Sequence, residues 1–170
     1  MPNIEGKPVV IRRAVVSDVP NVAQIINGYA SQGLMLPKSQ YDLYQGIRRF
    51  VVVTSGDQLI GCGALHVFWH DLAEVRSLAV EEEWMGKGIG RLILQHLIAD
   101  ARSLGVARIF TLTYRQRFFQ RLGFREVPKE SLPHKIWVDC LNCPKYPDCD
   151  ETAMLLDDLE AFTQANAQQG

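Results

Sequence analysis

The chain has 170 residues, of which 47% are hydrophobic and 22% are charged, as in ordinary globular proteins. This length fits a single domain over residues 1–170 that can bury a core without disulfides or metals. Eighteen Lys and Arg residues against nineteen Asp and Glu residues give a charge of −1, which gives no support to a nucleic-acid partner. There is no apolar run near the ~20 residues of a membrane span and no signal-peptide core, so we expect no membrane partner and a cytoplasmic location.

Alternating strand and helix patterns predict an α/β fold with its core over about residues 9–156. We expect strands at 9–14, 50–54, 59–68, 74–80, 108–113, 124–127 and 152–156. A first helix is expected to be capped by Ser17 and to end at Gly33, and a second to cover about 39–49. A third helix has the apolar stripe Ile89, Leu92, Ile93, Leu97, Ala101 and Leu104, and a short fourth helix contains Phe118 and Phe119. The tail after Glu160 is expected to be frayed.

Three glycines, Gly86, Gly88 and Gly90, lie between a predicted strand and the third predicted helix. Glycines let a backbone approach a ligand closely, and the N-terminus of a helix attracts anions, most often phosphates. Lys87 adds a positive charge. The loop lacks the Gly-Lys-Ser/Thr end of a Walker loop and the G-x-G-x-x-G spacing of a dinucleotide site. The alternative is a turn whose glycines only permit tight packing.

The stretch Leu78-Ala79-Val80 followed by Met85-Gly86-Lys87-Gly88-Ile89-Gly90 resembles the acetyl-CoA motif of the GNAT N-acetyltransferase superfamily. The segment from Phe118 to Phe124 resembles the second signature of that superfamily. The resemblance implies a mixed central sheet, splayed in the middle, with flanking helices. It also implies that Leu78, Ala79 and Val80 contact the pantetheine arm of acetyl-CoA, and that residues 85–90 hold its pyrophosphate. Two positions depart from the pattern of the superfamily. Met85 replaces an Arg or Gln, and Phe119, which the resemblance places among the cofactor-binding residues, replaces a tyrosine.

A narrower resemblance is to the acetyltransferase domain of N-acetylglutamate synthases. It covers residues 33–39, 61–65, 74–80 and 112–115. The family transfers acetyl from acetyl-CoA to the α-amino group of L-glutamate, the first step of arginine biosynthesis. Longer members also contain a kinase-like domain, for which this chain has no room. The resemblance therefore implies the short form, with acetyl-CoA and L-glutamate as substrates and a homodimer as its oligomer.

Acetyl transfer to an amine needs a neutral amine, a polarised thioester carbonyl and a proton for the leaving thiolate. The backbone N–H near Leu78 is expected to polarise the carbonyl. Glu74 is the candidate base and Tyr114 the candidate acid. The alternatives are a solvated or salt-bridged glutamate at a strand end and a half-buried tyrosine that packs at the rim of the site.

Glutamate has two carboxylates, so its site should offer cations, and arginine binds both oxygens of a carboxylate. Lys38, Arg76 and Arg115 lie in the segments that resemble the synthases. Strand alternation places Glu74 and Arg76 on one face, followed by Leu78. The alternative for any single cation is an ordinary surface charge.

Cys140, Cys143 and Cys149, with His134 before them, lie in a loop at about 134–150. Three thiols and one imidazole could complete a tetrahedral zinc site. The spacing is irregular for a zinc ribbon, so a redox-sensitive pair and structural thiols remain alternatives.

Two other functions remain open at this stage. The chain could acetylate another amino acid or small amine, or it could be a non-catalytic sensor that binds acetyl-CoA. The tyrosine that Phe119 replaces keeps the sensor hypothesis open. Acetyl transfer to an amine would separate an enzyme from a sensor.

Overall fold

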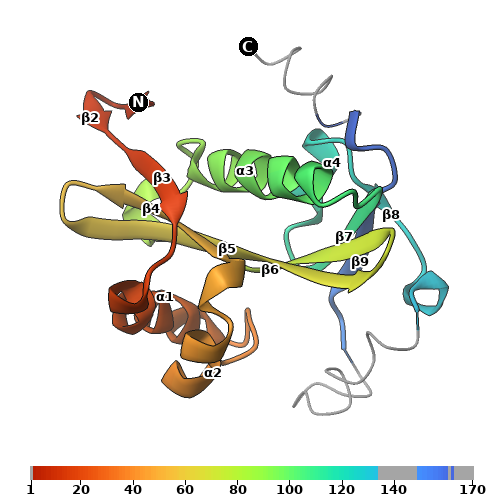
Figure 1. Ribbon diagram of the computed structural model, residues 1–170, viewed down its shortest axis with the longest axis horizontal. Helices are drawn as coiled ribbons and strands as arrows, with labels where there is room; N and C mark the ends of the chain where they lie inside the picture. Colours follow the sequence, from red (N-terminus) through yellow and green to blue (C-terminus); the bar gives the residue numbers. More distant parts are fainter. Residues whose placement is uncertain (1, 134–148, 161, 163–170) are drawn as a thin grey trace. The chain divides into compact units, whose positions relative to one another are not determined.

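The computed structural model describes residues 2–133, 149–160 and 162 (Figure 1). Its strands form a seven-stranded sheet of order β3-β4-β5-β6-β7-β9-β8 and a two-stranded sheet, β1-β2. The larger sheet is mixed, because β6 and β7 are parallel whereas β3–β4, β4–β5, β7–β9 and β8–β9 are antiparallel. The predicted α/β architecture is therefore confirmed. The described residues divide into unit 1, within 1–65 and 75–99, and unit 2, within 66–74 and 100–170.

Unit 1 contains the N-terminal hairpin, the first helices and the strands that precede the glycine loop. Its elements are β1 (Asn3–Ile4), β2 (Lys7–Pro8), β3 (Val10–Arg13), η1 (Val16–Asp18), α1 (Val19–Ala30), α2 (Gln40–Gln45), η2 (Ile47–Arg49), β4 (Phe50–Ser55) and η3 (Glu82–Trp84). Three longer elements, β5 (Gln58–Trp69), β6 (Leu72–Val80) and α3 (Ile89–Ser103), begin or end in unit 1 and continue into unit 2.

Helices cover both faces of the strands in unit 1, with α3 on one face and α1 and α2 on the other (Figure 1). On the α3 face, β5 presents Gly61 and Gly63, and a Cβ built at Gly63 would lie 2.7 Å from Ile93 Cγ2. On the opposite face, Cys62 packs in a buried cluster with residues of α1 that include Ile26. The two glycines thus let α3 approach β5 at backbone distance.

The first helix begins later than its sequence predicts. Val16–Asp18 form a 3₁₀ turn, so α1 starts at Val19 and its N-cap is Asp18 rather than Ser17. The Asp18 carboxylate accepts hydrogen bonds from the Val15 N–H at 2.8 Å and from the Arg12 guanidinium at 2.7 and 2.9 Å. These bonds fix the chain before the helix, and the Arg12 hydrogen bond lowers the pKa of Asp18.

The predicted helix at 39–49 is two short helices, α2 and η2, separated by Gly46. Ser39 caps α2 as a serine should, with its Oγ accepting the Asp42 N–H at 3.0 Å. The β1–β2 hairpin was not predicted. Its turn residues Glu5 and Gly6 have φ values of 51° and 77°, the left-handed pair that tight hairpin turns require.

The glycine-loop helix is confirmed, but its apolar stripe differs from the predicted one. Leu104 is 64% exposed because α3 ends at Ser103, and the left-handed Gly105 (φ 81°) then turns the chain away. Leu94 and Ile98 are buried in its place.

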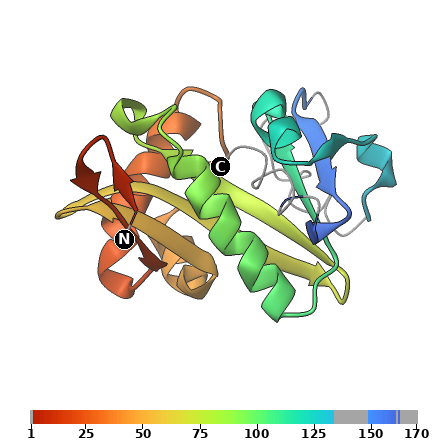
Figure 2. The same cartoon turned by 90° about the horizontal axis from the view of Figure 1, so that it is seen from above.

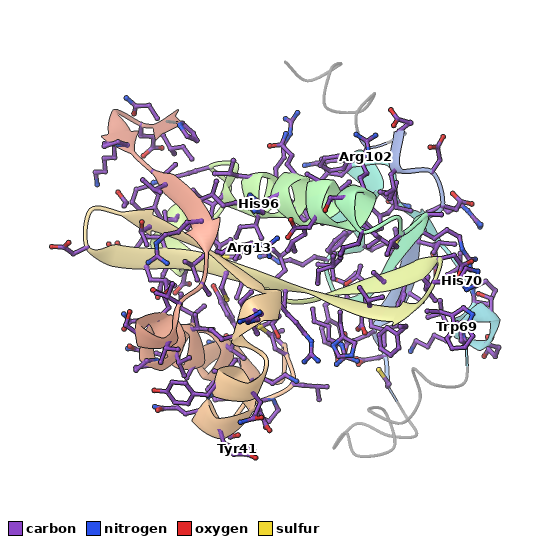
Figure 3. The ribbon with its side chains drawn as sticks, viewed as in Figure 1. Arg13, Tyr41, Trp69, His70, His96 and Arg102 are labelled. Atoms are coloured by element: carbon purple, nitrogen blue, oxygen red, sulfur yellow. The ribbon has the colours of Figure 1, made fainter. Side chains whose placement is uncertain are left out.

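Unit 2 contains β7 (Arg108–Thr113), α4 (Gln116–Arg121), β8 (Arg125–Glu126), η4 (Lys129–Ser131) and β9 (Thr152–Leu156). The predicted strands at 108–113 and 152–156 are confirmed, whereas the strand expected at 124–127 covers two residues. A buried cluster around Leu72, Phe110 and Leu155 forms the core of this unit. Trp69 and His70 lie exposed at the turn between β5 and β6 (Figure 3). Among the described residues, no helix combines the length and apolar character needed to cross a membrane.

The register between β6 and β7 is short. It comprises the pairs Leu72–Arg108, Ala73–Ile109 and Glu74–Phe110. Beyond Phe110, β7 continues in register with β9 as far as Thr113. The pairing of β6 with β7 thus ends at Glu74.

Candidate functional site

The glycine loop of unit 1 joins η3 to α3, and only some of its positions have a backbone conformation that requires glycine. Gly86 and Gly88 have φ values of 74° and 89°, which L side chains rarely adopt. A Cβ at either position would meet no atom within 4 Å, so the requirement comes from the backbone and not from lack of space. Gly90 lies inside α3 and has no such requirement. Two of the three glycines, Gly86 and Gly88, therefore form the turn.

The N-terminus of α3 provides hydrogen-bond donors. The first helical bond runs from the Leu92 N–H to the Gly88 carbonyl at 3.0 Å. The first N–H groups of a helix have no acceptor within that helix. They point out of its N-terminus, where the helix dipole also favours negative charge. This end of α3 is therefore suited to bind a phosphate group.

Lys87, in the middle of the loop, is held by the N-terminal hairpin. Its Nζ lies 2.9 Å from Glu5 Oε2 and 5.6 Å from the centre of the Trp84 ring. Lys7 of the hairpin lies over the same ring at 5.5 Å. Figure 2 shows the hairpin (dark red) beside the green loop that precedes α3. Sequence reasoning missed Glu5, Lys7 and Trp84, because no local pattern connects residue 5 to residue 87.

Strand β6, which precedes the loop, is irregular at Ser77. This residue has a φ of 54°, although it is not glycine. Regular strand geometry is therefore interrupted at Ser77, and the expected common face of Glu74, Arg76 and Leu78 stays a prediction. The Leu78 side chain lies on the α3 face, with its Cδ1 3.3 Å from a Cβ built at Gly63. The backbone of Leu78 and Ala79 thus follows a bend in the strand.

Two side chains bind carbonyl groups of this bent segment. The Cys62 thiol donates to the Ser77 carbonyl at 3.5 Å. The Tyr29 hydroxyl of α1 donates to the Val80 carbonyl at 2.5 Å and lies 3.7 Å from Met85 Sδ. Sequence reasoning did not select either residue, since Tyr29 and Val80 are 51 residues apart. Met85, which replaces the expected Arg or Gln, packs against a tyrosine instead of presenting a charge.

The predicted acceptor residue Lys38 has a fixed backbone. The Asn27 side chain accepts the Lys38 N–H at 2.9 Å and donates to the Lys38 carbonyl at 2.8 Å. The two bonds hold the start of the segment before α2 against α1. Lys38 is half-buried, as is Arg76 of β6. Asn27 is a further residue of the site that sequence reasoning missed.

In unit 2, the candidate base Glu74 is only 6% exposed and lies opposite Phe110 in the last register pair of β6 and β7. This burial excludes the alternative of a fully solvated glutamate, whereas a salt-bridged glutamate remains an alternative. Glu74 as the base stays a prediction.

Tyr114, the candidate acid, lies directly after β7. Its hydroxyl donates to Asp150 Oδ1 at 2.6 Å. Burial of the phenol, the Asp150 hydrogen bond and the nearby Glu151 charge raise the pKa of Tyr114. A phenol with a raised pKa is a weak acid, so Tyr114 would have to exchange Asp150 for the thiolate before it could serve as one.

The other predicted residues of unit 2 lie in α4 and in the cysteine segment. Arg115 is exposed and is the N-cap residue of α4, with its N–H donating to Thr113 Oγ1 at 2.8 Å. Phe119 is 3% exposed and packs edge-on against Phe118 and Phe124, with ring centres 5.0 and 5.1 Å away. The substitution of tyrosine by Phe119 therefore leaves no hydroxyl to satisfy in this core.

Most of the proposed zinc ligands, His134, Cys140 and Cys143, lie outside the described residues. The carbonyl of Cys149 accepts a hydrogen bond from Lys129 Nζ at 2.6 Å. Within the described parts of the chain, there is no group of three or more His, Cys, Asp or Glu residues that could hold a metal. Zinc binding thus stays a prediction from the sequence.

The predicted residues are divided between the two units. Unit 1 contains Lys38, Arg76, Leu78 and the loop, and unit 2 contains Glu74, Tyr114, Arg115 and Phe119. A bent strand, a glycine turn and a helix N-terminus lie together within unit 1, and their backbone geometry is suited to a phosphate-bearing ligand.

Comparison with known sequences identifies the family. Residues 46–126 match the acetyltransferase (GNAT) domain. The chain is 44% identical over 145 residues to an uncharacterized N-acetyltransferase of Chlorobaculum tepidum, which covers 85% of this chain and 94% of that one. It is 42% identical over 121 residues to an amino-acid acetyltransferase of Mycobacterium tuberculosis, which covers 69% of each chain. Longer relatives, such as the amino-acid acetyltransferase of Salmonella typhi, are matched over only 28% of their length.

Solved structures agree with the sequence comparison. A Mycobacterium tuberculosis protein crystallised in complex with CoA matches with a TM-score of 0.74 and 34% identity, covering 87% of this chain and 98% of that chain. N-acetylglutamate synthase from Neisseria gonorrhoeae, complexed with coenzyme A and N-acetyl-glutamate, matches with a TM-score of 0.80 and 29% identity, covering 87% of this chain and 34% of that chain. This chain belongs to the GNAT family of acetyltransferases. It is an acetyl-CoA-dependent N-acetyltransferase.

Proposed function

We propose that this enzyme transfers the acetyl group of acetyl-CoA to the α-amino group of L-glutamate. The observation that carries the proposal is the 42% identity to an amino-acid acetyltransferase over 69% of both chains. The likeness to a synthase complexed with N-acetyl-glutamate adds support for glutamate as the acceptor.

The proposed cofactor site uses the bent strand and the loop. The N–H groups around Gly86, Gly88 and the first turn of α3 bind the pyrophosphate, and Lys87 adds a positive charge. The pantetheine arm runs along Leu78, Ala79 and Val80. The Val80 carbonyl accepts the Tyr29 hydroxyl at 2.5 Å, which holds this end of the stretch against α1.

The proposed acceptor site supplies cations for two carboxylates. Lys38, Arg76 and Arg115 take this role. Lys38 has the best-defined position of the three, because Asn27 fixes its backbone on both sides. An amine acceptor without carboxylates would gain nothing from three cations.

The proposed reaction is a direct attack with no covalent enzyme intermediate. Glu74 accepts a proton from the ammonium group of glutamate, directly or through water. The freed amine attacks the thioester carbon, and the Leu78 N–H stabilises the resulting oxyanion. The nitrogen of the tetrahedral intermediate loses its second proton to water as the C–S bond breaks, and the thiolate takes a proton from water or from Tyr114.

Product analysis by mass spectrometry tests the proposal. The purified protein is incubated with acetyl-CoA and an equimolar mixture of amino acids and polyamines. We expect N-acetylglutamate to be the dominant product. A different dominant product would refute the glutamate assignment, and an absence of any product despite CoA binding would favour an acetyl-CoA sensor.

A matched pair of variants then tests the acceptor site. Lys38→Met keeps the aliphatic stem and removes the charge. We expect it to raise the KM for glutamate by about tenfold or more, the effect of losing one charge-assisted contact. Lys38→Arg should restore most of the affinity, and the KM for acetyl-CoA should not change in either variant. A parallel rise in both KM values would contradict a carboxylate-binding role.

A further inference from the structure

The backbone of β6 departs from strand geometry at Ser77, next to the peptide group proposed to polarise the thioester. Its φ of 54° lies in the left-handed region, where an L residue other than Gly, Asn or Asp is uncommon. Such a conformation persists only when the surrounding structure holds it. A residue that holds Ser77 would therefore determine the direction of the neighbouring N–H.

Cys62 is placed to hold this turn. It lies on β5 with no exposed surface, opposite Val52 of β4. Its thiol donates to the Ser77 carbonyl at 3.5 Å. The thiol is thus bonded to the residue that precedes Leu78.

The thiol remains a donor under all ordinary conditions. Burial raises the pKa of Cys62 to about 12, so the S–H proton is retained at any pH at which the enzyme would work. Buried, protonated thiols are also unreactive toward oxidants and alkylating reagents. A structural role explains this thiol better than a redox role.

The geometry of the peptide group connects Cys62 to the reaction. The Ser77 carbonyl and the Leu78 N–H belong to one planar trans peptide, so they point in opposite directions. When Cys62 holds the carbonyl toward the core beneath β5, the Leu78 N–H must point away from Cys62. The direction of this N–H is thus fixed by a side chain 15 residues earlier in the sequence.

We propose that Cys62 is a positioning residue, which fixes the left-handed turn at Ser77 and thereby aims the Leu78 N–H at the thioester carbonyl. This inference rests on the proposed role of Leu78 in acetyl transfer. Cys62 does not itself touch either substrate.

Kinetics of three variants test the proposal. Cys62→Ala removes the hydrogen bond to Ser77, Cys62→Ser keeps a donor, and Val52→Ala truncates the facing residue of the same core cluster. We expect Cys62→Ala to lower kcat by about tenfold, less than the 10²–10³-fold loss of a deleted oxyanion donor. The KM for glutamate should stay within about twofold, as expected when only the transition state loses an interaction. Cys62→Ser should keep most of kcat, and Val52→Ala should keep kcat at a similar loss of stability.

A double variant with Ser77→Gly also tests whether Cys62 acts through the turn at Ser77. Ser77→Gly removes the penalty of the positive φ, because glycine adopts this conformation freely. In the Ser77→Gly background, Cys62→Ala should lower kcat by no more than about threefold, since the turn no longer depends on the thiol. Equal losses in the two backgrounds would overturn the proposal.

A crystal structure of Cys62→Ala supplies a readout that does not depend on activity. We expect Ser77 to return to a negative φ in this variant. A positive φ retained at Ser77 would overturn the proposal. So would losses of kcat in Cys62→Ala and Val52→Ala that are proportional to their losses of stability, because Cys62 would then act only as a core residue. If the wild-type protein acetylates no amine, the proposed function fails, and the φ of Ser77 and the CoA affinity of the variants still decide whether Cys62 holds the turn.

Discussion

The close approach of α3 to β5 makes Gly63→Ala a sharp test of the packing that supports the loop. The new Cβ would lie 2.7 Å from Ile93 Cγ2 and 3.3 Å from both Leu78 Cδ1 and Leu97 Cδ1. Carbon atoms in contact prefer separations of ~3.5–4.0 Å, so α3 must move outward by roughly 1 Å. Overpacking of this kind costs about 1–3 kcal/mol. Because α3 begins at the glycine loop, the shift should also weaken CoA binding.

Urea denaturation measures the stability change and isothermal titration calorimetry measures CoA affinity. Gly28→Ala is the matched control, because a Cβ at this exposed helical position would meet no atom within 4 Å. That control should gain about 0.5–1 kcal/mol, from the lower conformational freedom of alanine, and bind CoA normally. In a double variant with Ile93→Ala, the cost of Gly63→Ala should shrink, because the clashing methyl is gone. Equal stabilities of Gly63→Ala and the wild-type enzyme would refute the reasoning.

Three further predictions follow from individual contacts. Tyr29→Phe removes the hydroxyl from the Val80 carbonyl, so it should cost about 1 kcal/mol of stability and raise the KM for acetyl-CoA several-fold. The Arg12 guanidinium lowers the pKa of Asp18, so the pair stabilises the fold fully above the ordinary aspartate pKa of ~4. This stabilisation is lost as the pH falls through the lowered pKa. In Arg12→Met, the free energy of unfolding should therefore fall less steeply toward acid pH. Because the pKa of Tyr114 is raised, this phenol stays protonated below about pH 10. Any fall of kcat with rising pH below that value should therefore be the same in Tyr114→Phe.

Each of these outcomes has a contrary result. A wild-type KM for acetyl-CoA in Tyr29→Phe would mean that the Val80 carbonyl needs no support from α1. An unchanged acid side in Arg12→Met would assign the acid sensitivity to other carboxylates. A limb that disappears in Tyr114→Phe would show that this phenol titrates during the reaction.

Hydrophobic periodicity and glycine placement were sufficient to predict most of the sheet. The strands at 108–113 and 152–156 have apolar patterns bounded by turns, and the structure keeps them unchanged. The glycine loop could also be predicted, because positive φ values leave a visible mark in residue type. These features depend on local sequence alone.

The differences arise where distant residues act on the backbone. Ser17 resembles a helix cap, but the Arg12–Asp18 ion pair favours a 3₁₀ turn that moves the helix start to Val19. The bend at Ser77 is invisible in sequence, because its serine reads as an ordinary strand residue and the thiol that holds it lies on another strand. Asn27 acts on Lys38 in the same way, through main-chain bonds. Residues that act through backbone contacts carry no motif of their own.

The pairing of Lys87 with Glu5 has a consequence for how salt should affect the enzyme. In the proposed cofactor site, a phosphate at the loop replaces the Glu5 carboxylate, which lies 2.9 Å from the Lys87 ammonium. Dissolved ions weaken both the pair that is lost and the pair that is gained, so their effects partly cancel. Cofactor affinity should then change less with ionic strength than the number of positive charges at the loop suggests. In that proposed site, the Glu5 carboxylate would be the counterion of Lys87 until the phosphate binds, which would lower the salt dependence of cofactor binding.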